Sequence, residues 1–258
     1  MNNGNMRLFV ACFIALIATS FGFIIRALTM DTWAAEFGFS ETQKGEIFGV
    51  GLWPFAISIV LFSLIIDKIG YGKAMLFAFV CHLASIGITI YAYKFKPAEG
   101  VAGAEAEALR SSAYWTLYFA NFIVALANGT VEAVINPVVA TMFSREKTKW
   151  LNILHAGWPG GLVLAGVLVI ALKTYAPDLQ LIPDAPTWCT RVAILAIPVL
   201  RYGLLLLGCK FPVNERVAAG VSFRDMLKEV GFLGALVVTS LIVFEVTRVL
   251  EGMEQVKL

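Results

Sequence analysis

Seven long runs of mostly apolar residues constrain this chain more than any other feature of its sequence. A helix needs about 20 such residues to cross the roughly 30 Å hydrocarbon core of a bilayer. The composition agrees, because 59% of the residues are hydrophobic and 15% are charged, whereas about a quarter of the residues of a soluble domain are charged. The sequence therefore predicts an all-α, polytopic membrane protein. The predicted spans are residues 7–28, 47–66, 74–93, 114–143, 151–172, 188–209 and 231–250.

The connections between these runs suggest three parts. We expect a six-helix transmembrane bundle over residues 1–210, a cytoplasmic linker over 211–230, and the start of a truncated second bundle over 231–258. Within the linker, the segment from Ser222 to Val230 begins with a residue that favours helix N-caps and has the pattern of an amphipathic helix on the membrane surface.

The distribution of positive charge predicts the orientation of the chain. With the N-terminus inside, ten Lys and Arg side chains lie in the inner segments and seven in the outer ones. We therefore expect a multi-pass protein of the plasma (inner) membrane with a cytoplasmic N-terminus. The polar segments 31–46 and 94–112 are then outer connections. The first run has one leading cation, as signal peptides do, but its length and the hydrophobic chain after it favour a retained span.

The cysteines and the overall charge point to no cofactor, metal or nucleic acid. The four cysteines lie in or at the ends of apolar runs without CxxC or Cys/His spacing, so we interpret them as small hydrophobic residues: Cys12, Cys81, Cys189 and Cys209. The net charge of +2 gives no reason to expect a nucleic-acid partner. The His, Cys and acidic residues show no ligand or nucleophile spacing, which argues against a membrane-embedded enzyme.

A carboxyl group lies near the middle of the fourth run. The midpoint of 114–143 falls beside Asn128, which places Glu132 only about 5 Å further inward at a rise of about 1.5 Å per residue. A charged side chain at that depth costs roughly 2.5–3.5 kcal/mol on insertion scales. Spacings of 7, 4 and 4 residues place four polar side chains on one helical face: Asn121, Asn128, Glu132 and Asn136.

Two interpretations of this polar stripe are open. In the structural one, the Asn and Glu side chains hydrogen-bond to neighbouring helices, with the acid protonated. In the functional one, the stripe lines an aqueous cavity where a carboxyl group loads and releases a proton and accepts hydroxyl groups of a solute. Small residues beside the stripe would let a neighbouring helix approach closely: Ala125, Gly129 and Ala133.

Polar residues of the first and fifth runs are candidates for the same cavity. Arg26 lies about 11 Å outward of its span's midpoint, so a ligand would fit between Arg26 and Glu132 more easily than a direct ion pair would form. Arg26 would alternatively extend to the outer interface. His155 shares a helical face with Asn152 and is either a structural residue or a proton relay. Small residues around Pro159 indicate a flexible or closely packed helix: Gly157, Gly160, Gly161 and Gly166.

Three motifs resemble one family of transporters. The segment between the second and third runs is similar to the GxxxD(R/K)xG loop signature of the major facilitator superfamily, with Ser63 in place of the first glycine and four matches: Asp67, Lys68, Gly70 and Lys73. Glu132-Ala-Val-Ile-Asn136-Pro137 resembles the ExxxNP segment of fucose permease and its glucose/galactose transporter relatives within that superfamily. Leu151-Asn152 with His155 resembles a further segment of the same relatives.

The resemblance implies a fold and a mechanism. Such proteins have two six-helix bundles, each made of inverted three-helix repeats, around a central site, and this chain would supply the first bundle and one further helix. The resemblance assigns proton coupling and sugar binding to Glu132, and a gating contact with the second bundle to the Asp67 loop. An acidic residue that it leads us to expect in the first span is replaced by Arg26 or Ala27.

Two functions from different classes remain at this point. The first is secondary active transport of a small polar solute by alternating access, most simply a sugar, with protons as the candidate coupling ion. Its partners would be the solute, the lipid bilayer, and either a missing C-terminal bundle or a second copy of the chain. The alternative is a non-transporting seven-helix membrane sensor or assembly protein.

Overall fold

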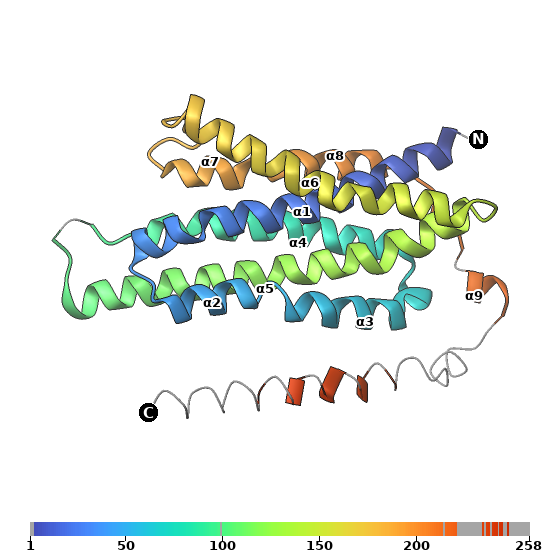
Figure 1. Ribbon diagram of the computed structural model, residues 1–258, viewed down its shortest axis with the longest axis horizontal. Coiled ribbons are helices and arrows are strands. Elements are labelled where there is room, and N and C mark those ends of the chain that lie inside the picture. Colours follow the sequence, from blue (N-terminus) through green and yellow to red (C-terminus); the bar gives the residue numbers. More distant parts are fainter. Residues whose placement is uncertain are drawn as a thin grey trace. The chain divides into compact units, whose positions relative to one another are not determined.

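In the computed structural model, the described parts of the chain are predominantly helical (Figure 1). The structure describes residues 3–98, 100–213 and 215–220, together with isolated positions between 234 and 247. The chain divides into two compact units, Met1–Pro212 and Val213–Leu258. The predicted surface helix from Ser222 to Val230 lies outside the described residues, as do most residues of the predicted seventh span. In the second unit, α9 is a single turn, Glu215–Ala218.

Six segments of the first unit are long and apolar enough to cross a membrane, at the positions of the first six predicted spans. Four of them are continuous helices: α1 (Asn3–Phe37), α4 (Tyr71–Tyr91), α5 (Gly103–Met142) and α6 (Lys147–Tyr175). The other two are pairs of helices: α2 (Glu41–Gly49) with α3 (Trp53–Ile69), and α7 (Thr187–Ala193) with α8 (Ala196–Leu206). A 3-10 helix, η1 (Ala92–Phe95), extends α4. The predicted all-α membrane fold is confirmed.

The polar segments 31–46 and 94–112, which join the predicted spans, are mostly helical over their described residues. α1 continues into the first segment and ends at Phe37, followed by Gly38, whose φ of 73° suits a glycine helix stop. α2 then begins after Ser40, which forms a reciprocal capping box with Gln43. In the second segment α5 begins at Gly103, because alanine and glutamate are strong helix formers even without an apolar face.

α1 and α5 form the buried centre of the first unit. α1 packs against α6 and α8, whereas α5 packs against α3 and α4, and α1 and α5 also contact each other. Figure 1 shows these long helices running side by side along the longest axis of the view.

Glycines allow the closest helix contacts around this centre. An added Cβ on Gly161 of α6 would collide with Ser20 Oγ of α1, and one on Gly157 would lie 2.9 Å from the Phe13 ring. A Cβ added to Gly160 or to Gly166 would meet no atom within 4 Å. Close helix packing therefore does not require glycine at these two positions. On α5, a Cβ at Gly129 would collide with the Phe55 carbonyl oxygen of α3, which confirms the close approach predicted from the small residues there.

Candidate functional site

A small cavity lies where α1, α5 and the break between α2 and α3 meet. Its volume is about 20 Å³, enough for one water molecule. It brings together three of the polar residues predicted from the sequence. The full lining, which we call the Arg26 cavity, consists of Gly22, Phe23, Arg26, Phe48, Gly51, Leu52, Asn121, Val124 and Asn128.

Arg26 is buried in the bundle and does not extend to the outer interface. It is 4% exposed. Nη1 donates to the Gly22 carbonyl oxygen at 3.1 Å, and Nη2 donates to Ser85 Oγ of α4 at 2.8 Å. Nε is buried without a hydrogen-bond partner among the described residues. A Cβ on Gly22 would lie 3.0 Å from Nη1, so the glycine makes room for the guanidinium to fold back along its own helix.

Asn128 belongs to a hydrogen-bond chain that crosses the bundle. His82 Nε2 lies 2.9 Å from Asn128 Oδ1, and His82 Nδ1 lies 2.8 Å from the Tyr202 hydroxyl of α8. Because the amide oxygen is an acceptor, Nε2 is the donor, and in a neutral ring Nδ1 then accepts from Tyr202. His82 is 2% exposed, so the middle of this polar chain is buried, whereas Asn128 at its end is half-buried.

The sequence reasoning missed His82 and its neighbour Ser85, whose hydroxyl also donates to the Ala120 carbonyl oxygen at 2.6 Å. A signal for them exists in the third run. His82, Ser85 and Thr89 are spaced 3 and 4 residues apart, so they share one helical face, and all three are buried. A polar stripe of this kind on a second span would have pointed to a partner for the stripe on α5.

Glu132 and Asn136 form a separate group further along α5. Asn136 Nδ2 donates to the Glu132 main-chain oxygen at 3.0 Å and to Glu132 Oε2 at 3.2 Å. Both side chains are half-buried. The Asn136 amide oxygen is buried and lacks a hydrogen-bond partner among the described residues. The carboxyl group is therefore oriented from within its own helix and is not tied to another span in the described part of the chain.

The two candidates on α6 are exposed. His155 and Asn152 both lie on its open face, on the side away from Leu154 and Gly157, which are buried. His155 nevertheless lies in the neighbourhood of Glu132. The structure therefore brings His155 towards the Glu132 group, and it does not place Asn152 in a defined contact.

The sequence matches the Major Facilitator Superfamily profile over residues 8–249, which is nearly the whole chain. The chain belongs to the major facilitator superfamily. No curated protein matches it. Major facilitators are membrane transporters that bind small molecules within the membrane, so the coarse function predicted from the sequence is confirmed, as is the multi-pass membrane location.

The loop that carries the major facilitator signature is a sharp connection between α3 and α4. Gly70 alone joins the two helices, with a φ of 81° that favours glycine. Asp67 lies in the last turn of α3, and both its carboxylate oxygens are buried without a hydrogen-bond partner among the described residues. Lys73 is exposed in the first turn of α4.

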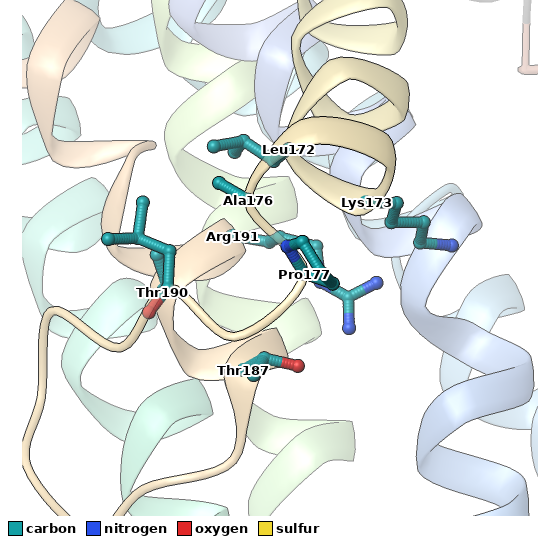
Figure 2. A pocket seen from close by; sticks show the side chains of 8 residues that line it. Leu172, Lys173, Ala176, Pro177, Thr187, Thr190 and Arg191 are labelled. Carbon is teal, nitrogen blue, oxygen red and sulfur yellow. The ribbon is translucent and has the colours of Figure 1, made fainter.

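A second cavity, of about 90 Å³, lies where α6 ends and α7 begins. Figure 2 shows that its side chains come from the last turn of α6, the following loop and the start of α7. Its charged members are Lys173 and Arg191. None of the site residues predicted for this major facilitator lines it.

Proposed function

We propose that this major facilitator is a secondary transporter of a small polar solute of sugar type, and that Glu132 couples transport to proton movement. The observation that carries the proposal is the state of the Glu132–Asn136 pair. It combines an ionisable group within a spanning helix with a buried amide oxygen that has no hydrogen-bond partner in the described chain. Ionisable groups at such depth are costly and mark solute or proton pathways.

The solute would bind along the polar face of α5. Asn121, Asn128, Glu132 and Asn136 offer amide and carboxyl groups that suit the hydroxyl groups of a sugar. Arg26 extends this set through the cavity that it shares with Asn128. His155, which lies near Glu132, would complete the site from α6 together with Asn152.

Alternating access requires a second bundle against which this one rocks. We propose that a further bundle or a second copy of the chain supplies it, and that Asp67, Lys68, Gly70 and Lys73 form the gating loop. The unpartnered Asp67 oxygens support this role, because a buried carboxylate without a hydrogen bond is unfavourable until a partner arrives. The protein would lie in the plasma (inner) membrane with its N-terminus cytoplasmic.

The test is uptake of a panel of labelled sugars into proteoliposomes with and without a pH gradient. We expect the gradient to accelerate uptake by the unchanged protein and Glu132→Gln to remove the acceleration. Glu107→Gln is the matched control, because Glu107 lies on the same helix but is exposed and pairs with Arg110. Uptake and pH dependence that survive Glu132→Gln intact would show that Glu132 has no coupling role.

A further inference from the structure

The Arg26 cavity carries a positive charge that no acidic residue neutralises within the described part of the chain. A guanidinium has five N–H donors, and here two of them donate, to Gly22 and to Ser85. The remaining three include the buried, unpartnered Nε. None of the residues that line the cavity is an Asp or a Glu. Because an unpaired buried cation is strongly unfavourable, the cavity favours an anion.

Two other features of the cavity also suit an anion. Asn128 uses its amide oxygen for His82, and its amide nitrogen has no hydrogen bond to a described residue, so a donor remains. In addition, the break between α2 and α3 lines the cavity at Gly51 and Leu52.

At this break the Phe48 and Gly49 carbonyl oxygens accept hydrogen bonds from the Gly51 and Leu52 amides, at 3.0 and 2.9 Å. α3 then begins at Trp53 without a side-chain cap. Its N-terminal end therefore carries partial positive charge, and the residue before it, Leu52, lines the cavity. Transporters with discontinuous spanning helices use such half-helix N-termini to bind anionic groups of their solutes.

The cavity also holds one acceptor for a hydroxyl group. Asn121 Nδ2 donates to the Leu117 carbonyl oxygen at 2.8 Å. Its amide oxygen faces the break, since a Cβ on Gly51 would lie 4.0 Å from it. From Asn128 to Glu132 the helix rises by about 6 Å, which is roughly the length of a six-carbon sugar chain beyond its first carbon.

We infer that the transported solute is a hydroxylated carboxylic acid of the size of a sugar acid. Its carboxylate binds Arg26, Asn128 and the N-terminal end of α3, and its hydroxyl groups bind Asn121 and Glu132. The inference rests on the proposed transport function and names the class of solute within it. The cavity has a volume of about 20 Å³, so it must widen to admit a carboxylate group.

Glucuronate and glucose form the matched pair for the test, because they differ in a carboxylate in place of one CH₂OH group. Uptake of each into proteoliposomes is measured for the full chain, Arg26→Gln and Arg26→Lys. We expect glucuronate to be taken up at least about tenfold better than glucose by the unchanged protein, since charge-assisted bidentate contacts are about twice as strong as neutral ones. Arg26→Gln should remove this preference, and Arg26→Lys should retain part of it.

Arg201→Gln is the matched control, because Arg201 is an exposed arginine of another spanning segment, α8, and does not line the cavity. It should leave the preference unchanged. If Arg26→Gln does not fold, the uptake of the two solutes by the unchanged protein still tests the inference, because equal uptake of glucose and glucuronate would contradict it.

Two results would overturn the inference while the proposed function stands. One is equal uptake of glucose and glucuronate with an equal loss of both in Arg26→Gln. The other is thermal stabilisation of the unchanged protein by chloride that matches the stabilisation by glucuronate, because the cavity would then hold a small inorganic anion. Failure of the proposed function differs from both, since neither solute would then enter the proteoliposomes with or without a pH gradient, and the inference would fall with it.

Discussion

The polar stripe on α5 has two ends that differ in how their hydrogen bonds are satisfied. Around Asn128 the bonds cross between helices, through His82 to Tyr202 and through Ser85 to Arg26. Around Glu132 the side-chain bonds stay within one turn of α5, and one amide oxygen lacks a partner within the described chain. The first end connects helices, whereas the second makes no side-chain hydrogen bond to another helix among the described residues.

This difference bears on the two interpretations that the sequence left open. The structural one describes the His82 end, where polar side chains link α4, α5 and α8 in a buried network. The functional one suits the Glu132 end, where an ionisable group makes no contact that would hold the bundle together. Arg26 has features of both ends, because its Nη2 donates to Ser85 of α4 while its Nε has no hydrogen-bond partner among the described residues.

Removing His82 should have the largest effect on stability. His82→Ala leaves the Tyr202 hydroxyl and the Asn128 amide oxygen without their partner and opens a cavity in a buried region. We expect the free energy of unfolding to fall by about 2–3 kcal/mol. Unfolding in mixed detergent and dodecyl sulfate, followed by tryptophan fluorescence, measures it.

The other histidine of the chain provides the control. His155 is exposed on α6, so His155→Ala should change the free energy of unfolding by less than about 0.5 kcal/mol. Equal losses for the two substitutions would mean that the network around His82 has no special structural role.

The membrane spans could be predicted from the sequence because the length of an apolar run decides whether it crosses a bilayer. The break between α2 and α3 could not, since its run of residues is as apolar as the others. Gly49, Gly51 and Pro54 mark the position in retrospect. A non-helical stretch at this depth is tolerated only where protein or a cavity satisfies its backbone, and that environment is set by α1 and α5.

The candidate site likewise has features that the sequence predicts and features that only the packed bundle shows. The shared face of Asn121 and Asn128 follows from helical periodicity, and their meeting with Arg26 follows from the packing of α1 on α5. The partner of Asn128 was missed because the spacing of His82, Ser85 and Thr89 indicates a polar helical face but not which helix that face contacts. The orphaned donors of Arg26 are likewise invisible in a sequence, because hydrogen bonds between distant helices depend on the packed bundle.

Tyr202→Phe tests the far end of the network with a smaller change. It removes one hydroxyl and leaves His82 Nδ1 without its bond, but it preserves the ring that packs edge-on against Phe79. Hydrogen bonds between membrane helices average about 0.6 kcal/mol, so we expect a loss of about 1 kcal/mol in the free energy of unfolding and no change in uptake. Tyr175→Phe is the control, because Tyr175 is 86% exposed. A change in uptake would show that the network extends into the transport pathway.

Asn136→Ala should have the smallest effect on stability. Asn136 bonds only to Glu132, within its own helix, and its amide oxygen is an unsatisfied buried acceptor in the described structure. Replacing such a group by alanine removes its desolvation cost together with its bonds, so the free energy of unfolding should stay within about 0.5 kcal/mol. Uptake driven by a pH gradient should fall about tenfold, because the Glu132 carboxyl loses the donor that orients it. A stability loss above about 1 kcal/mol with unchanged uptake would place Asn136 with His82 as a structural residue, and the contrast between the two ends of α5 would disappear.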